Sequence, residues 1–498
     1  MTSQTNTNRA YLAIDQGTTS SRAIVFNAEF EMACTAQQEF VQYYPRNGWV
    51  EQDPEELWQS VLAVTREALA AAQQQGLHVT HIGIVNQRET TLVWHRDSGK
   101  PIYNAIVWQD RRTSQYCRSQ SAHEDMVQQK TGLRLDPYFS ASKIRWILDN
   151  VDDAARLAGN GDLLFGTVDC YLIWRLTGGH VHATDVTNAS RTSLYNIVEH
   201  DWDDELLSLF DIPRSMLPEV KDCAADFGMT APGILDVDLP ISGVAGDQQA
   251  AMIGQGCLAP GSVKATYGTG CFALVNTGEH CPISQSGLLT TIAYRLNGKT
   301  HYAVEGAIFV AGAAVQWLRD GLGLIAKAAD SEAIASQVGN QHGLVVVPAF
   351  TGLGAPHWQP DARGAIFGIT RATSADDIVR ATLESVCFQT YDLLTAMSLS
   401  DISPTILKVD GGMVANEWFC QYLADTLYIP VVRPKVMETT ALGAALLAAL
   451  QAGDIADLNE LAQANPCQQS FTPSGDTDRD IQLTRWHKAV QATLLMAQ

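Results

Sequence analysis

Short apolar runs separated by turn residues dominate the start of the chain. One apolar run ends at Asp15, a polar segment follows over residues 16–21, and a second apolar run continues to Phe26. Runs of this length, bounded by turn residues, predict two buried strands joined as a hairpin. The tip offers a carboxylate, a glycine, four successive hydroxyls and a guanidinium. These groups could hold polyphosphate and its metal, although an exposed polar hairpin has the same pattern.

The same pattern returns half a chain later. Strand-like runs over residues 262–267 and 271–275 flank a turn of glycine and threonine, which predicts a second hairpin of this kind. Two matching hairpins, one in each half, suggest a duplicated architecture that holds a nucleotide between the halves. A further strand, residues 407–410, ends in Asp-Gly-Gly before a helix, where a nucleoside could bind. A tight left-handed turn would explain those two glycines equally well.

The remaining pattern is typical of alternating strands and helices. Asp53 followed by proline and two acids predicts a helix start, because aspartate caps helices and acids favour their first turn. A strand over residues 81–85 places Arg88 and Glu89 just beyond its end, where α/β proteins bind ligands. A strand over residues 240–247 ends at Asp247. Further strands are predicted at 105–108, 163–167 and 343–348, and helices at 248–256, 376–397, 439–451 and 480–496.

Length and charge limit the class of protein. A chain of 498 residues is too long for one core, so two domains are expected, 1–255 and 256–498. Apolar content of 46% is that of an ordinary globular protein. The net charge of −21 disfavours binding to nucleic acid or an anionic membrane. A phosphate substrate would therefore depend on local donors, because the overall field repels it.

Cysteine usage and hydropathy predict a cytoplasmic protein. The ten cysteines are scattered without a Cys-x-x-Cys pair, which is typical of free thiols in a reducing compartment. Residues 1–9 are polar, unlike a signal peptide. The longest apolar run, Ala441–Leu450, is too short to cross a bilayer and predicts a buried helix.

Several segments, in matching order and spacing, resemble one enzyme family. The two hairpins and the Asp-Gly-Gly strand resemble the actin/hexokinase/Hsp70-type ATPase fold, and Tyr138–Asn150 resembles the signature of the FGGY carbohydrate kinases. Residues 86–91, 103–109 and 246–250 are similar to bacterial members that phosphorylate glycerol. The resemblance extends from about Tyr11 to Ala449. It implies an α/β fold of two duplicated ribonuclease H-like domains with a cleft between them.

The resemblance also implies an activity, its cofactors and its site residues. The expected reaction is ATP-dependent, in-line phosphorylation of glycerol to sn-glycerol 3-phosphate and ADP with Mg²⁺, in glycerol catabolism, with Asp247 as the base. The substrate residues it implies are Arg88, Glu89, Trp108, Tyr138, Asp247, Gln248 and Phe272. The nucleotide residues are Thr18, Thr19, Ser20, Arg22, Thr269, Gly312, Gln316, Gly412 and Asn416, with Asp15 on the magnesium.

The chemistry of these residue types suits such a reaction. Phosphoryl transfer needs positioning, charge neutralisation and an acceptor for the alcohol proton. Arginine donates, carboxylates accept and tyrosine does either, so these groups can pair the hydroxyls of a small polyol. Each has an ordinary alternative: Asp247 as a helix cap, Asp15 in a turn and Arg88–Glu89 as a surface ion pair. Likewise, Trp108 could be core packing and Gln316 part of a solvated helix face.

Two other functions remain open at this point. Another kinase of the family, acting on a pentulose or sugar acid, is the nearest, although Trp108 beside Arg88–Glu89 favours glycerol. A chaperone- or filament-type ATPase of the same fold is the second. The resemblance implies a homodimer or tetramer. Some relatives bind fructose 1,6-bisphosphate through an arginine-containing loop, and residues 228–240 contain no arginine or lysine, so such a site is not expected here.

Overall fold

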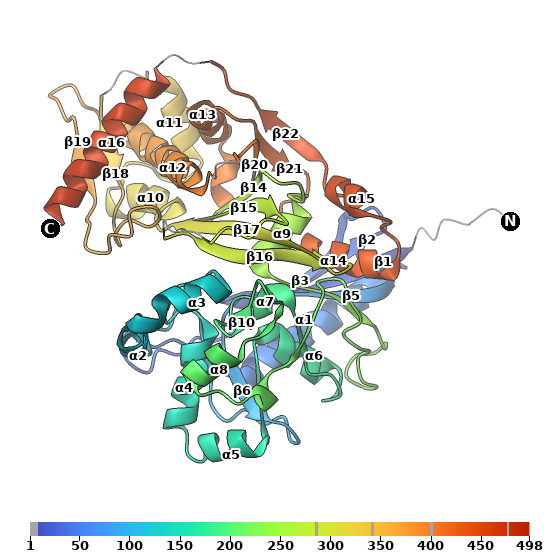
Figure 1. Ribbon diagram of the computed structural model, residues 1–498. Coiled ribbons are helices and arrows are strands. Elements are labelled where there is room, and N and C mark those ends of the chain that lie inside the picture. The colour runs from blue at the N-terminus through green and yellow to red at the C-terminus, as the bar shows by residue number, and fades with distance from the viewer. Residues whose placement is uncertain (1–7, 284–286, 340–342, 399–401, 476–477, 498) are drawn as a thin grey trace.

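Two large β-sheets and the helices around them form the protein (Figure 1). The computed structural model describes residues 8–283, 287–339, 343–398, 402–475 and 478–497, so most of the polar start of the chain lies outside the described residues. Within these ranges one sheet has the strand order β13-β5-β1-β2-β3 and the other β16-β17-β15-β14-β20-β21-β22. The amino-terminal half supplies the first sheet and the carboxyl-terminal half the second. The predicted α/β fold is therefore confirmed.

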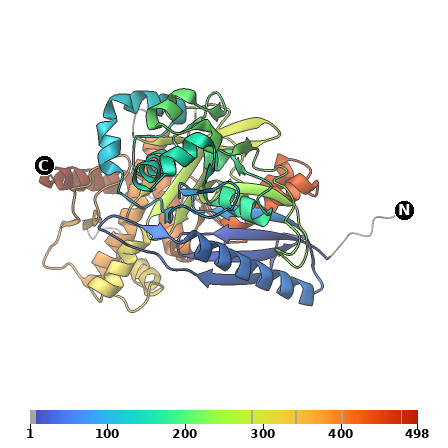
Figure 2. The same ribbon diagram turned by 90° about the horizontal axis from the view of Figure 1, so that it is seen from below.

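The first sheet is built around the predicted hairpin. Strands β1 and β2 pair antiparallel, and β5 and β13 continue from β1 in parallel. Alternate residues of β1 face opposite cores, because side chains of a strand alternate between its faces. Helix α1 (Pro54–Gln74) covers one face (Figure 2). The Asp53 carboxylate caps this helix as predicted. The strands are β1 (Arg9–Gln16), β2 (Ser20–Asn27), β3 (Met32–Glu39), β5 (His78–Asn86) and β13 (Ile241–Gly246).

The second sheet repeats this arrangement. Strands β14 and β15 form an antiparallel hairpin, and β20 and β21 continue from β14 in parallel. This hairpin-plus-parallel pattern in both sheets is the duplication that the sequence predicts. The strands are β14 (Ser262–Tyr267), β15 (Cys271–Gly278), β16 (Leu289–Leu296), β17 (Lys299–Ile308), β20 (Ile406–Asp410), β21 (Val431–Pro434) and β22 (Cys467–Phe471). Helices α12 (Ala375–Met397), α13 (Glu417–Leu427) and α16 (Arg479–Met496) share its core.

Two helices between the sheets hold the halves together (Figure 1). Helix α14 (Thr439–Ala452) contains the longest apolar run, which is buried almost throughout, and packs on β5, β13 and α9 (Asp247–Gly254). A Cβ at Gly443 would lie 1.9 Å from the carbonyl oxygen of Ala250, so glycine permits this close approach. Since α14 crosses from the second half onto the first sheet, the division at residue 255 stays a proposal.

The other elements complete the two halves. In the first half, α7 (Val186–Ala189) contacts β16 of the second sheet. The strand predicted over 105–108 is shorter in the structure, where β7 ends at Ile106. Further elements there are β4 (Glu51–Gln52), β6 (Leu92–His95), β7 (Ala105–Ile106), β8 (Leu163–Gly166), β9 (Ala183–Asp185), β10 (Tyr195–Asn196), β11 (Asp201–Trp202), β12 (Glu219–Lys221), α2 (Ser114–Ser119), α3 (Glu124–Thr131), α4 (Ser140–Asn150), α5 (Ala154–Asn160), α6 (Val168–Leu176) and α8 (Asp204–Phe210). The second half adds α10 (Gly312–Gln316), α11 (Asp330–Gln337), α15 (Leu458–Gln463), β18 (Val345–Val347) and β19 (Ala365–Phe367).

The cysteine and hydropathy expectations can be compared with this fold. None of the ten cysteines, all of which lie in the described ranges, forms a disulfide. No helix in the described part of the chain is both long and apolar enough to span a bilayer.

Candidate active site

The tip of the β1–β2 hairpin brings a carboxylate and a guanidinium together. Asp15 and Arg22 are direct cross-strand partners, and the tip closes through a 2.9 Å bond from Gly17 N to the Ser20 carbonyl oxygen. Thr18 and Ser20 are half-buried at this tip and Thr19 is exposed. Burial raises the pKa of Asp15 to about 7, with Arg22 opposing the rise and Asp247 adding to it. A cation bound nearby would favour the charged form of a carboxyl group buried in this way.

Arg22 already has a partner from the other half of the chain. Its Nη1 lies 2.5 Å from Oε2 of Glu438, the residue before α14. A phosphate bound at this tip would therefore compete with Glu438 for the guanidinium. The pair is partly exposed to solvent, so its own stabilising contribution is modest, on the order of 0–1 kcal/mol.

The tip of the second hairpin forms one wall of a cavity of about 560 Å³. The first turn of α10 bonds back to this tip, because the Gly312 N–H donates to the Gly268 carbonyl and the Ala313 N–H to that of Thr269. Helices α11 and α12 and the turn after β20 form the other walls. Five residues that the sequence predicts for the nucleotide line this one cavity: Thr269, Gly312, Gln316, Gly412 and Asn416.

The Asp-Gly-Gly turn after β20 is a tight turn, and its second glycine also lines the cavity. Gly411 has a φ of +95°, and a Cβ there would lie 2.4 Å from the Tyr267 carbonyl oxygen, so the turn requires this glycine. Gly412 has no such restriction, and nothing lies within 4 Å of a Cβ added to it. A short 3₁₀ turn over Gly412–Ala415 precedes α13, and Asn416 caps that helix through its side chain. The second glycine thus leaves the cavity open beside the cap.

Asp247 follows directly from β13 and lies beside Arg88, a predicted substrate residue. Helix α9 begins at Asp247 itself, so Gly246 and not Asp247 occupies the capping position. One carboxylate oxygen, Oδ1, accepts from the Gln248 N–H at 2.7 Å and lies 3.2 Å from Arg88 Nε. The side chain is 35% exposed. Oδ2 takes part in neither contact, so it can accept a proton from a bound hydroxyl.

A buried polar network fixes the strand ends that carry these groups. The Asp185 carboxylate caps α7 and accepts from the Thr187 hydroxyl at 2.7 Å, and that hydroxyl accepts from the Gly246 N–H at 2.9 Å. Asn188 extends the network to β5, because its side-chain amide exchanges two 3.0 Å bonds with that of Asn86. The residues preceding Asp247 and Arg88 are therefore held by one segment, β9 and α7.

We expect replacement of Thr187 by valine to lower kcat several-fold. The KM values for the two expected substrates, glycerol and ATP, should stay nearly unchanged. Valine keeps the shape but cannot accept from Gly246, and an unsatisfied buried N–H costs about 1–3 kcal/mol. Steady-state kinetics and thermal unfolding measure both effects. Thr187→Ser is the matched control, since it keeps the hydroxyl, and equal kcat losses in both variants would contradict the role of this bond.

Arg88 and Glu89 are buried, so they are not a surface ion pair. Their exposed fractions are 3% and 1%. Glu89 has a φ of +61°, a strained conformation for a non-glycine residue. Its carbonyl oxygen accepts from Thr91, Ser140 and Lys143 at 3.1, 3.1 and 3.4 Å. Burial lowers the pKa of Lys143 to about 8. The start of α4 therefore holds the strained residue in place.

Two residues that the sequence did not single out complete this cluster. Glu305, on β17, accepts from Arg88 Nη1 at 2.7 Å and from Nη2 at 2.9 Å. Arg191 donates from Nε to Glu89 at 2.6 Å and from Nη2 to Glu305 at 3.3 Å. Burial raises the pKa of Glu305, but Arg191 and Arg88 outweigh burial and hold it at about 2. The positive charges of two guanidinium groups are thus balanced by the negative charges of two carboxylates.

Aromatic rings stand beside the charged cluster. Trp108 is half-buried, and its ring lies edge-on to that of Tyr138, with centroids 5.6 Å apart. The indole N–H donates to the Thr18 hydroxyl at 3.0 Å, which joins this wall to the first hairpin. Phe272 is half-buried, and its register puts it on the same face of the second sheet as Glu305.

The last predicted substrate residue, Gln248, has a charged partner. Its side-chain oxygen accepts from the buried ammonium of Lys264 at 2.5 Å.

Comparisons with known proteins show the family of this chain. The model of the FGGY family of carbohydrate kinases matches with its N-terminal domain over residues 10–254 and its C-terminal domain over 263–452. The chain belongs to the FGGY family of carbohydrate kinases.

Individual members of the family are similar over nearly their whole length. Glycerol kinase 1 of Pseudomonas aeruginosa is 58% identical over 483 residues, 96% of this chain and 98% of that protein. Glycerol kinase of Rhodospirillum centenum is 56% identical over 485 residues, 97% of each. The structure of Plasmodium falciparum glycerol kinase with ADP is 36% identical, with a TM-score of 0.93 and 98% of both chains covered.

In this FGGY kinase, the residues missed from sequence had a visible signal. Lys264 and Glu305 each stand between small or apolar neighbours inside a strand, and Arg191 follows a run of small and polar residues. A charge in a buried strand needs a partner, because isolated burial is costly. That rule marks the positions as requiring an explanation, but it names no partner, and each partner here comes from a distant segment.

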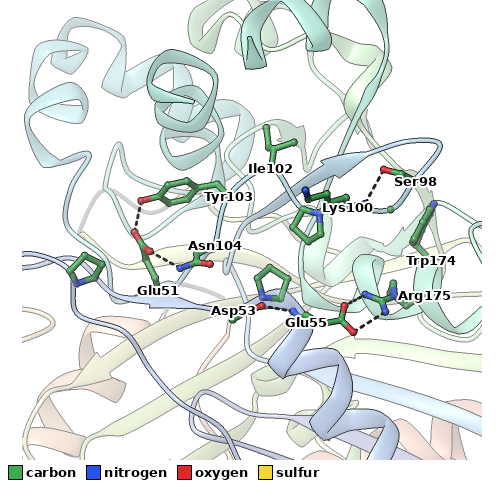
Figure 3. Close-up of a pocket in the computed structure, with 14 residues that line it drawn as sticks. Glu51, Asp53, Glu55, Ser98, Lys100, Ile102, Tyr103, Asn104, Trp174 and Arg175 are labelled. Atoms are coloured by element: carbon green, nitrogen blue, oxygen red, sulfur yellow. Dashed lines mark hydrogen bonds and ion pairs between the residues drawn. The ribbon is translucent and has the colours of Figure 1, made fainter. Parts of the chain in front are cut away.

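A larger cavity of this FGGY kinase, about 850 Å³, lies elsewhere (Figure 3). None of the predicted site residues lines it. Its carboxylates already have partners: Glu51 accepts from Tyr103 and Asn104, and Glu55 pairs with Arg175 at 2.8 Å (Figure 3). The residues that the sequence predicts for phosphoryl transfer lie elsewhere, at the two hairpin tips, after β5 and β13, and around the smaller cavity.

Proposed function

We propose that this protein transfers the γ-phosphoryl group of ATP to glycerol and forms sn-glycerol 3-phosphate and ADP. The observation that carries the proposal is the meeting of Asp247, Arg88 and Glu89 beside the aromatic pair Trp108–Tyr138. Similarity to proteins named glycerol kinase, at 56–58% identity over nearly the whole chain, supports glycerol as the alcohol.

The alcohol would lie between charged and aromatic side chains. Arg88 Nε would donate to a hydroxyl, while Glu89 and Asp247 accept, and the Trp108 ring would cover the carbon edge. A site that pairs every hydroxyl discriminates strongly against analogues that lack one, by up to about 10⁴–10⁵-fold, because its own buried groups are left unpaired. Asp247 would take the proton as the oxygen attacks, which is the role of a general base.

The nucleotide would lie in the cavity beside the second hairpin, with its phosphates reaching both tips. Thr269 and Gly412 would contact it from one side, and Thr18, Thr19, Ser20 and Arg22 would meet the phosphates from the other. Gln316 and Asn416 also line the cavity. The similar structure of Plasmodium falciparum glycerol kinase is a structure with ADP, which supports nucleotide use.

Asp15 is the residue we propose to hold Mg²⁺. The described residues contain no cluster of three or more histidine, cysteine, aspartate or glutamate side chains suited to a metal. A single carboxylate fits Mg²⁺, which takes its other ligands from phosphates and water. The bound ion would neutralise charge on the transferred group. The raised pKa of Asp15 supports this role, because burial outweighs the cationic partner that the protein itself supplies.

The division into domains 1–255 and 256–498, a cytoplasmic location and a homodimeric or tetrameric assembly are also part of the proposal. We expect the halves to close over both substrates, since water competes with the alcohol. Residues 255–261 connect α9 to β14, the first strand of the second sheet in chain order, and Gly256 and Gly261 there have positive φ values.

A substrate panel tests the function directly. Purified protein is assayed for ADP release with glycerol, dihydroxyacetone, xylulose or gluconate, each with ATP and Mg²⁺. We expect glycerol to give the highest kcat/KM and release without an alcohol to be small. Preference for xylulose or gluconate would replace glycerol with another substrate of this family, and fast release without any alcohol would contradict the proposed transfer.

A further inference from the structure

A charged residue of the second half is built into the alcohol site, whose residues come mostly from the first half. Glu305 lies in the middle of β17, where its strand neighbours are Val304 and Gly306, and its side chain is 3% exposed. Cross-strand pairing with Leu274 puts it on the sheet face that also carries Phe272. The carboxylate therefore reaches Arg88 across the boundary between the two halves.

We propose that Glu305 is a positioning residue that sets which edge of Arg88 faces the alcohol, with Arg191 as its counterpart for Glu89. The inference rests on the proposed function, because it assigns these residues to the same alcohol site. Neither residue is among those that the sequence predicts to contact the substrate. Their effect is exerted through Arg88 and Glu89.

The geometry of Arg88 leaves one edge for the substrate. The guanidinium is a rigid fork, and its two Nη groups both bond to the carboxylate of Glu305. Nη1 also donates to Gln249 at 3.2 Å. The Nε–Nη2 side of the fork remains: one N–H of Nη2 is outside these bonds, and Nε lies 3.2 Å from Oδ1 of Asp247. Glu305 therefore directs the N–H of Nε towards the base and towards any hydroxyl bound between them.

Without this carboxylate the guanidinium would have another partner within reach. Asp247 is already the nearest carboxylate to Nε, and a two-bond pair between Arg88 and Asp247 would satisfy both charges. Such a pair would occupy the oxygen that accepts the alcohol proton and would remove the donor from the alcohol. Glu305 opposes this by fixing the plane of the guanidinium, so that Nε stays near Oδ1 of Asp247.

Arg191 ties the second substrate residue to the same carboxylate. Its Nε bonds to Glu89 and its Nη2 to Glu305, while its Nη1 is buried without a hydrogen-bond partner among the described residues. The guanidinium carbon lies 5.7 Å from the Tyr138 ring centroid. Glu89 and Arg88 thus share one anchor, which fixes the spacing between an acceptor and a donor for neighbouring hydroxyls.

The variant Glu305→Gln tests the proposal. Glutamine has nearly the same shape, but its NH₂ group faces an N–H of Arg88 where an oxygen was. We expect KM for the alcohol to rise about 30-fold or more and KM for ATP to change less than about twofold, because the nucleotide cavity contains no part of the cluster. The alcohol used is whichever substrate the wild type phosphorylates best in the panel, so failure of glycerol and failure of this inference are separate results.

Glu384→Gln is the matched control. Glu384 lies on α12 in the same half, is also 3% exposed, and also accepts from an arginine, Arg380, at 2.7 Å. Both variants lose a buried carboxylate of an ion pair, so both are expected to lower the melting temperature. Only Glu305→Gln is expected to change KM for the alcohol.

Glu305→Asp keeps the test decisive if the glutamine variant does not fold. Aspartate retains the charge but is one methylene shorter, so it can hold only one Nη group well, and we expect a rise of about 5–10-fold in KM for the alcohol. An alcohol KM within twofold of wild type in the folded variant, or an equal rise in Glu384→Gln, would overturn the proposal and leave the pair as a structural ion pair.

Discussion

Replacing Asp247 by asparagine is expected to lower kcat by at least about 100-fold, the usual scale for loss of a positioned base. In the structure Oδ1 accepts from Gln248 N and lies near Arg88 Nε, and asparagine keeps an oxygen there. The amide nitrogen then takes the place of Oδ2. The fold and nucleotide binding should be retained, because only the ability to accept a proton is lost.

Coupled measurement of ADP release at saturating glycerol and ATP gives kcat, and thermal unfolding confirms that the variant is folded. Asp457→Asn is a suitable control, since Asp457 is also at a helix start but caps α15, away from the site. It should leave kcat unchanged. A kcat near the wild-type value in Asp247→Asn would remove Asp247 from the mechanism.

The second large effect is expected from Gly312→Ala. A Cβ at this position would lie 2.5 Å from the carbonyl oxygen of Gly268, which is backbone and cannot rotate away. The N–H of Gly312 donates to that same oxygen, so relief of the clash must shift the hairpin tip that carries Thr269. Overpacking of this kind costs about 1–3 kcal/mol. We expect KM for ATP to rise about tenfold or more, with little change in KM for glycerol.

The comparison that isolates this effect is Gly159→Ala. Gly159 lies in α5, and nothing lies within 4 Å of a Cβ added there, so alanine should stabilise the helix slightly and leave kinetics unchanged. An ATP KM near the wild-type value in Gly312→Ala would show that the contact between α10 and the hairpin does not position the nucleotide.

Local sequence signals predicted most of the fold. The two hairpins, the helix start at Asp53 and the buried helix over 441–450 depend on neighbouring residues, because turn chemistry, capping and apolar periodicity act over a few positions. Boundaries were less well determined, as at β7, where tertiary contacts decide how far a strand continues.

The candidate site also has one part that local sequence predicts and another that depends on the tertiary structure. The sequence by itself determined which residues stand at strand ends and hairpin tips, and the family resemblance gave them expected roles, which the variants above test. Only the tertiary structure decided which residues form pairs. Glu305 pairs with Arg88 at a sequence separation of 217 residues, Arg22 with Glu438 at 416 residues, and Thr187 with Gly246 at 59 residues. These contacts join strands and helices whose packing depends on the whole chain. A pattern that acts over a few residues contains no information about such partners.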